Sequence, residues 1–190
     1  PMSGDESGRP GRIIHYDGSK WSPMSSPTTD WLGFVWGSSN RDVFATGHGG
    51  VILHYDGRTW SAMQSGTSYT LLGIWGTSAS DVFTVGEAGT ILHYDGSKWS
   101  PMNSGVSGFW LLSLWGSSSK DVFASGCLGT LLHYDGNAWS RMNSNITFSG
   151  DLWTVWGSSG SDVFAVGAAG TILHYNGSAW SPMNSGTNNE

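Results

Sequence analysis

One sequence unit recurs along most of this chain every 39 to 41 residues. Its landmarks come in fixed order: a Trp-Gly pair, an Asp-Val-Phe tripeptide, a His-Tyr-Asp/Asn-Gly tetrapeptide and a closing Trp. The tetrapeptide begins at His15, His54, His93, His133 and His174. A period of about 40 residues limits the fold to a solenoid, a propeller or another repeat array.

Each unit divides into four short runs rich in aromatic and β-branched residues, separated by Gly, Ser and Asn. In one copy these runs are Leu71–Gly76, Asp81–Gly86, Gly89–Tyr94 and Trp99–Met102. The pattern predicts four antiparallel strands and excludes helical solenoids, while the hairpin turns disfavour a parallel β-helix. Asp-Gly dipeptides and the Gly-x-x-Gly segment before the third run predict tight turns whose glycines adopt positive φ. Four strands in about 40 residues are typical of a propeller blade.

The repeats predict an all-β fold, a β-propeller forming a single domain over residues 1–190. Four full repeats cover residues 30–64, 65–103, 104–143 and 144–186, and residues 11–25 hold only the third and fourth strands of another. We therefore expect a ring of five blade positions with one incomplete blade; the alternative is a closed four-blade ring with an extra hairpin. Because unpaired strand edges invite pairing, the incomplete blade predicts a homo-oligomer in which a neighbouring molecule completes it.

The motifs Trp-Gly-Ser-Ser, Asp-Val-Phe-Ala-Val-Gly and Gly-Thr-Ile-Leu-His-Tyr-Asp-Gly-x-x-Trp resemble a bacterial β-propeller repeat family. That family is distantly similar to Asp-box, photosystem II assembly-factor and tachylectin-type propellers. The resemblance covers residues 11–186. It implies the propeller fold and favours a secreted or cell-surface protein, and it leaves the function open.

Composition narrows the classes of partner. The chain has 8 Lys and Arg against 14 Asp and Glu, a formal net charge of -6, so it lacks the basic face that nucleic acids require. No apolar run is long enough to span a bilayer, which predicts no membrane insertion. A single cysteine, Cys127, excludes an intrachain disulfide. No motif indicates a cofactor.

The residues that recur in every copy are interpreted as framework. We expect the repeated Trp and Phe and the Met of the fourth strand to be core. The tryptophans are Trp36, Trp75, Trp115 and Trp156, and the phenylalanines are Phe44, Phe83, Phe123 and Phe164. Each repeated His is expected to donate to the repeated Asp of its own blade instead of binding a metal, because the copies are spread around the ring. The Asp before each turn Gly is a turn residue, and Asn176 replaces it in the last copy.

Positions at which the copies differ indicate a binding surface. They lie in the segment leading into the first strand and in the turn between the second and third strands, which share one rim of a propeller. The predicted ligand-binding residues are Asp30, Trp31, His48, Tyr69, Glu87, Phe109, Trp110, Asp151 and Trp153. Aromatic faces beside polar groups suit a carbohydrate or a peptide. In the alternative interpretation, these aromatics plug the channel or cover the inner strand ends.

The sequence offers little material for catalysis. It has no Gly-x-Ser-x-Gly elbow, phosphate loop or zinc motif, and its arginines are too scattered for a sialidase-like glycoside hydrolase. We expect no catalytic residue and no enzymatic activity. The predicted function is a non-catalytic binding module, most concretely a lectin-like carbohydrate binder. The alternatives are a protein-interaction scaffold from a larger surface or secreted protein and, as the least favoured, a glycoside hydrolase of sialidase-like architecture.

Overall fold

The computed structural model describes residues 11–144 and 150–186, which are all-β except for four short 3-10 turns. The first sheet is a hairpin of β1 (Ile13–Tyr16) and β2 (Trp21–Met24). The first four-stranded sheet contains β3 (Leu32–Ser39), β4 (Asp42–Gly47), β5 (Ile52–Tyr55) and β6 (Trp60–Met63). The second contains β7 (Leu71–Ser78), β8 (Asp81–Gly86), β9 (Ile91–Tyr94) and β10 (Trp99–Met102). The third contains β11 (Leu111–Ser118), β12 (Asp121–Gly126), β13 (Leu131–Tyr134) and β14 (Trp139–Arg141). The fourth contains β15 (Leu152–Ser159), β16 (Asp162–Gly167), β17 (Ile172–Tyr175) and β18 (Trp180–Met183). The turns η1 (His48–Gly50), η2 (Glu87–Gly89), η3 (Cys127–Gly129) and η4 (Ala168–Gly170) join the second strand of each four-stranded sheet to its third.

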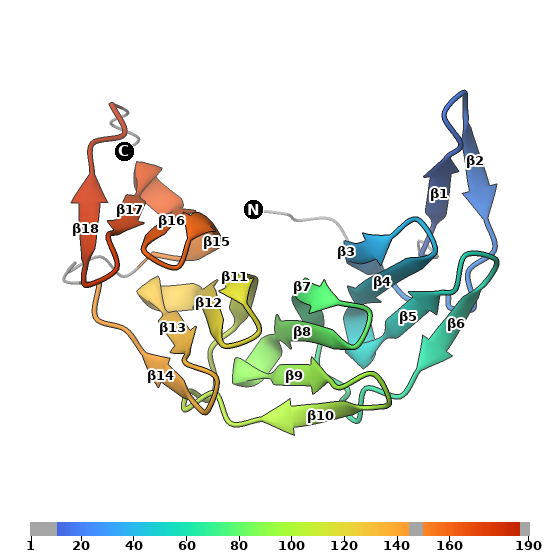
Figure 1. The fold of residues 1–190 in the computed structure, drawn as a ribbon, viewed down its shortest axis with the longest axis horizontal. Coiled ribbons are helices and arrows are strands. Elements are labelled where there is room, and N and C mark those ends of the chain that lie inside the picture. Colours follow the sequence, from blue (N-terminus) through green and yellow to red (C-terminus); the bar gives the residue numbers. More distant parts are fainter. Residues whose placement is uncertain (1–10, 145–149, 187–190) are drawn as a thin grey trace.

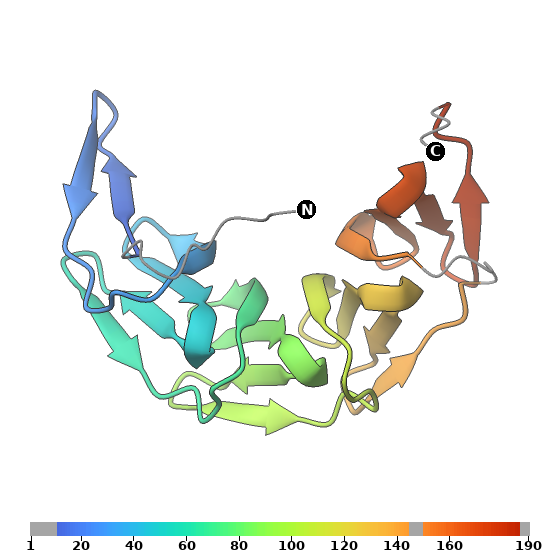
Figure 2. The ribbon, with the colours of Figure 1, turned by 180° about the vertical axis from the view of Figure 1, so that it is seen from behind.

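Every sheet is an antiparallel meander with its strands in sequence order, as a propeller blade requires. The propeller fold and the five blade positions, one of them incomplete, are therefore confirmed. Figure 1 shows the first strands β3, β7, β11 and β15 on the inside and the fourth strands on the outside. The blades form an open arc, with the β1–β2 hairpin at one end and the β15–β18 sheet at the other (Figures 1 and 2). The described blades do not close into a ring, so the competing closed four-blade ring is not formed by these residues. The predicted boundaries also include residues 1–10, 145–149 and 187–190, which lie outside the described residues.

Neighbouring blades pack through one repeated aromatic contact. At all three interfaces the Phe of the second strand lies against the Tyr of the next blade, and at two of them it also lies against the closing Trp. Phe44 lies 5.7 Å from Tyr94 and 6.1 Å from Trp99, measured between ring centroids. Phe123 repeats this contact with Tyr175 at 5.6 Å and Trp180 at 6.4 Å. Phe83 lies 5.9 Å from Tyr134. Burial of these rings, with the aliphatic residues around them, makes each blade interface a hydrophobic core.

The Trp-Gly pair has a packing explanation. The Trp ring of one blade lies on the Gly of the next, so that a Cβ on Gly116 would lie 2.7 Å from the Trp75 ring. The same approach occurs between Trp115 and Gly157, at 2.6 Å. Any side chain larger than hydrogen at these glycines would displace an indole ring from the interface.

The last blade corrects part of the predicted core. Trp156 is 59% exposed and Met183 is 48% exposed, and Phe164 is only half-buried, whereas Phe123 is 1% exposed. Within the described residues no further blade packs on this face, so the repeated aromatics there stay in contact with solvent. The methionines of β2, β6 and β10 are also only half-buried.

The turns between second and third strands correct the expected role of the first of their two glycines. Gly86 has an extended backbone, with φ -172°, and its absent Cβ matters instead because a Cβ there would lie 2.0 Å from the Thr70 carbonyl oxygen. Gly89 has φ 76°, as expected. Ala88 and Leu128 also occupy the left-handed region, with φ 55° and 53°, although this region favours glycine.

The Asp of each outer hairpin stabilises its turn through its carboxylate. The Oδ1 atom of Asp95 accepts hydrogen bonds from the hydroxyl and N–H of Ser97, at 2.7 and 2.8 Å, and from the N–H of Lys98 at 2.9 Å. These bonds, chiefly the one from the Ser97 hydroxyl, lower the pKa of Asp95 to about 2. The Oδ1 atom of Asn176 accepts the same three bonds in the last blade, which explains why Asn is tolerated there.

Asp95→Asn is expected to leave the fold intact at neutral pH, because Asn176 already performs this role in the same turn. Since folding lowers the pKa of Asp95 below its ordinary value of 3.8, the stabilisation from its ionised form is present above that value. It is lost as the pH falls through about 2. Thermal unfolding midpoints measured across this range should therefore fall less steeply in the variant than in the wild type. Parallel pH profiles would contradict this account of the turn.

Candidate functional site

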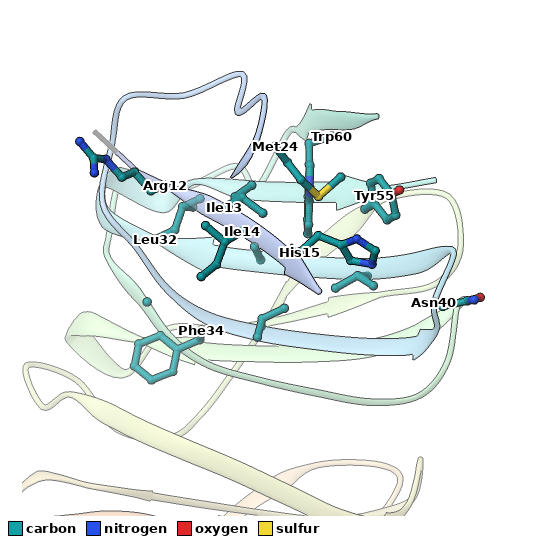
Figure 3. Close-up of a pocket in the computed structure, with 14 residues that line it drawn as sticks. Arg12, Ile13, Ile14, His15, Met24, Leu32, Phe34, Asn40, Tyr55 and Trp60 are labelled. Carbon is teal, nitrogen blue, oxygen red and sulfur yellow. The ribbon is translucent and has the colours of Figure 1, made fainter. Parts of the chain in front are cut away.

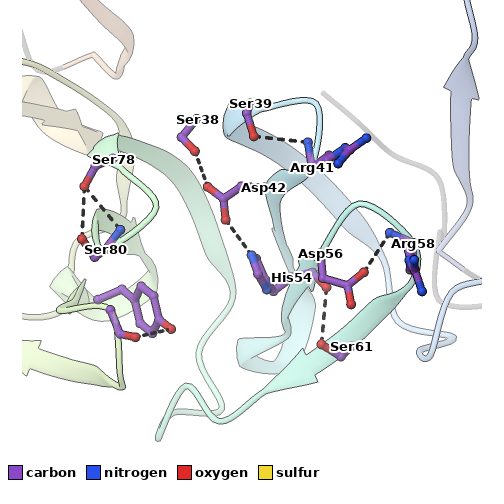
Figure 4. Close-up of polar contacts among 12 residues, drawn as sticks. Ser38, Ser39, Arg41, Asp42, His54, Asp56, Arg58, Ser61, Ser78 and Ser80 are labelled. Atoms are coloured by element: carbon purple, nitrogen blue, oxygen red, sulfur yellow. Dashed lines mark hydrogen bonds and ion pairs between the residues drawn. The ribbon is translucent and has the colours of Figure 1, made fainter.

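The repeated histidines form pairs with the repeated aspartates. The Nε2 atoms of His54, His93, His133 and His174 lie 2.7 Å from Oδ1 of Asp42, Asp81, Asp121 and Asp162, respectively. The other oxygen of Asp42 accepts a hydrogen bond from the Ser38 hydroxyl (Figure 4). The predicted pairing of His with its blade-mate Asp is confirmed in all four complete blades. These pairs hold the second and third strands together.

In the described part of the chain, no group of three or more His, Cys, Asp or Glu side chains could hold a metal ion.

The predicted binding residues lie along one rim of the arc. Hydrogen bonds join the segment before each first strand to the turn of the same blade. The N–H of His48 donates to the Trp31 carbonyl at 3.0 Å, and the N–H of Cys127 donates to the Trp110 carbonyl at 2.9 Å. Every blade thus contributes the same pair of loops to the rim. The aromatic side chains there are exposed to 38% at Trp31, 49% at Tyr69, 36% at Phe109, 47% at Trp110 and 59% at Trp153.

The Trp31 indole of the first complete blade lies where a side chain on Gly33 would be, and in the last blade the equivalent position of Gly33 is Trp153. The Trp31 ring folds over Gly33, where a Cβ would lie 2.0 Å from it, and it meets Phe34 edge to face at a centroid distance of 6.0 Å. Gly33 and Trp153 both directly follow the residue that opens the first strand of their blade. Trp31 therefore partly covers the first strand of its own blade, while Trp153 is more open to solvent.

The polar residues of the rim divide into two groups. Glu87 accepts a hydrogen bond from the N–H of Thr70 at 2.9 Å, and Asp151 accepts one from the N–H of Leu128 at 3.2 Å. These two carboxylates therefore hold the loops of the rim together. His48 and Asp30 are exposed.

The thiol of Cys127 lies beside Asp151 on the same rim. Its burial and, to a lesser extent, the negative charge of Asp151 raise the pKa of Cys127, so its thiol stays protonated and is a poor nucleophile at neutral pH.

Two hollows border the first complete blade. One of about 490 Å³ lies beside η1 and is lined by backbone-rich segments around residues 27–28, 49–53 and 62–68. The other, of about 370 Å³, lies between the β1–β2 hairpin and the sheet β3–β6 (Figure 3). Its apolar lining includes Ile13, Met24, Leu32, Tyr55 and Trp60. Sequence reasoning missed this pocket, although the two strands absent from the first repeat were the signal for it.

No family model and no curated protein sequence matches the chain. Solved structures do match, among them one described as YCF48 bound to D1 peptide, with a TM-score of 0.66 and 17% sequence identity. The chain has the propeller fold of YCF48. The match covers 96% of this chain and 61% of that structure. YCF48 from Cyanidioschyzon merolae matches with a TM-score of 0.69 and 16% identity over 88% of this chain and 64% of that one. The chain thus spans less than two thirds of the length of either YCF48 structure.

Among the described residues, no helix is long and apolar enough to cross a membrane.

Proposed function

We propose that this chain is a non-catalytic binding module that holds a peptide segment of another protein along its variable rim. The observation that carries the proposal is the series of five exposed aromatic side chains on this rim, contributed by all four complete blades. Aromatic rings on a rigid scaffold provide large contact areas at low entropic cost and are the usual anchors of protein interfaces.

Two further observations support binding over catalysis. Glu87 and Asp151 are engaged with backbone N–H groups, so neither is poised as one of a pair of catalytic carboxylates. The similar structure described as YCF48 bound to D1 peptide indicates that a propeller of this kind can accept a peptide.

A carbohydrate is the second candidate ligand. Three of the exposed side chains are indoles, those of Trp31, Trp110 and Trp153. Indole faces stack well on the apolar faces of sugars, and repeated sites would add avidity to weak single contacts. A lectin of this kind fits a secreted or cell-surface protein.

Peptide and glycan arrays probed with the whole chain distinguish the two ligands. For a ligand found on either array, Trp110→Ala is expected to weaken binding by about tenfold or more, because it removes an exposed anchor. Trp156→Ala is the matched control, since Trp156 is also exposed but lies on the end face of the last blade. A folded chain that binds nothing on either array, or that loses equal affinity in both variants, would contradict the proposal.

A further inference from the structure

The hairpin β1–β2 is the outer half of a blade. In each complete blade, the second strand pairs with the third, so that Phe44 stands opposite His54 and Val43 opposite Tyr55. Among the described strands, β1 pairs only with β2, although β1 corresponds to a third strand. Within residues 11–144 and 150–186, its inward edge therefore presents unpaired backbone N–H and C=O groups, which can accept another strand.

The 370 Å³ pocket lies beside this edge, and its walls are repeat positions whose contacts are known from the other blades. Tyr55 and Trp60 line the pocket. Their counterparts, Tyr94 and Trp99, contact the Phe44 ring of the preceding blade. The same aromatic packing recurs in the third interface, between Phe123 and the next blade. The pocket therefore has the lining that holds a phenylalanine from a second strand elsewhere in this chain.

Two side chains at the site lack the contacts that their counterparts make. His15 corresponds to the four histidines paired with Asp, but it is exposed and has no Asp opposite it in the described residues. Val35 lines the pocket and is 68% exposed, whereas its counterpart Leu114 in the third blade is 6% exposed. An incoming strand with Asp and Phe two residues apart would supply a partner for His15 and cover Val35.

We propose that the incomplete blade is a strand-acceptor site. It binds a strand segment of the type Asp-Val-Phe-x-x-Gly, which pairs with the inward edge of β1 and inserts its Phe into the pocket. Backbone pairing supplies affinity and the pocket supplies sequence selectivity, as in other cases of strand addition. A folded second copy is not the occupant, because all four of its Asp-Val-Phe segments already lie within its own sheets.

The test uses a synthetic peptide with the sequence of residues 152–167, which holds a first and a second strand of this repeat. Isothermal titration of the whole chain with this peptide is expected to show binding with one peptide per chain. A peptide carrying Phe164→Asp should bind about tenfold more weakly or not at all, because a carboxylate would enter an apolar pocket. In the chain, Val35→Glu should weaken binding similarly, and its exposure means that the fold tolerates the change. Val166→Glu, on the far end of the arc, is the matched control and should bind the peptide as the wild type does.

Three results would overturn the proposal. The first is no binding by the folded wild-type chain up to about 1 mM peptide, which corresponds to an affinity too weak for a specific site. The second is equal binding of the two peptides or equal binding by the Val35→Glu and Val166→Glu chains. The third is self-association of the peptide-free chain that Val35→Glu abolishes, which would make a second copy the occupant.

Discussion

Phe123→Ala is expected to lower the free energy of unfolding by about 3–5 kcal/mol, as is usual when a large buried aromatic is truncated. Phe123 is 1% exposed and contacts His133 of its own blade and both Tyr175 and Trp180 of the next. Its removal leaves a cavity between two rigid sheets that can close only if the blades shift. Urea unfolding followed by circular dichroism measures the loss.

Phe164→Ala is the matched control for this prediction. Phe164 has the same place in its blade and the same ring contact with its histidine, at 4.6 Å, but no blade covers it among the described residues. We expect a loss of about 1 kcal/mol, as for a partly exposed side chain. Equal losses at the two positions would show that the contact between blades contributes little and that the contacts within a blade dominate.

Gly126→Ala is expected to destabilise the chain by about 1–3 kcal/mol, the range for overpacking at a closely packed position. A Cβ at Gly126 would lie 2.2 Å from the Trp110 carbonyl oxygen, which accepts the N–H of Cys127. The backbone must move to relieve this overlap, and the hydrogen bond that joins the two loops of the rim lengthens. The same substitution should therefore also reduce binding of any ligand that depends on Trp110.

Gly105→Ala separates this overlap from a general effect of replacing glycine. Gly105 has open space where a Cβ would be, and its φ of 71° adds only the penalty of the left-handed region, roughly 1–2 kcal/mol. We expect it to leave the rim and ligand binding unchanged. Stability from thermal unfolding and affinity for the array ligand should be measured together, because a loss of binding in Gly105→Ala would contradict the specific role of Gly126.

The sequence predicted those features that depend on neighbours within one repeat. The four strands, the Asp-Gly turns and the pairing of Asp42 with His54 all lie within one copy, and each was confirmed by the structure. These features follow from alternating hydrophobicity and turn chemistry, which a single sequence carries in full.

The features that the sequence did not predict depend on where a copy stands in the array. Trp75 and Trp156 occupy the same position in their repeats, yet only Trp156 is exposed, because no described residues form a blade against that face of the last sheet. The pocket beside β1 arises in the same way, from two strands that one repeat lacks. For the rim, the predicted aromatics are exposed as a binding site requires, but their role in binding stays a prediction.

The contact between an indole and a glycine limits how the number of repeats in such a chain can change by insertion or deletion. Because Trp36, Trp75 and Trp115 each meet a Gly of the following copy, a copy inside the array carries both halves of the same junction. Adding or deleting one whole copy in the middle of the array joins a Trp to a Gly again, with no compensating substitution. A change of any other length would break the junction. Insertions and deletions in this architecture are therefore tolerated when they add or remove one whole blade. The number of blades can then change while the residues that join neighbouring blades stay the same.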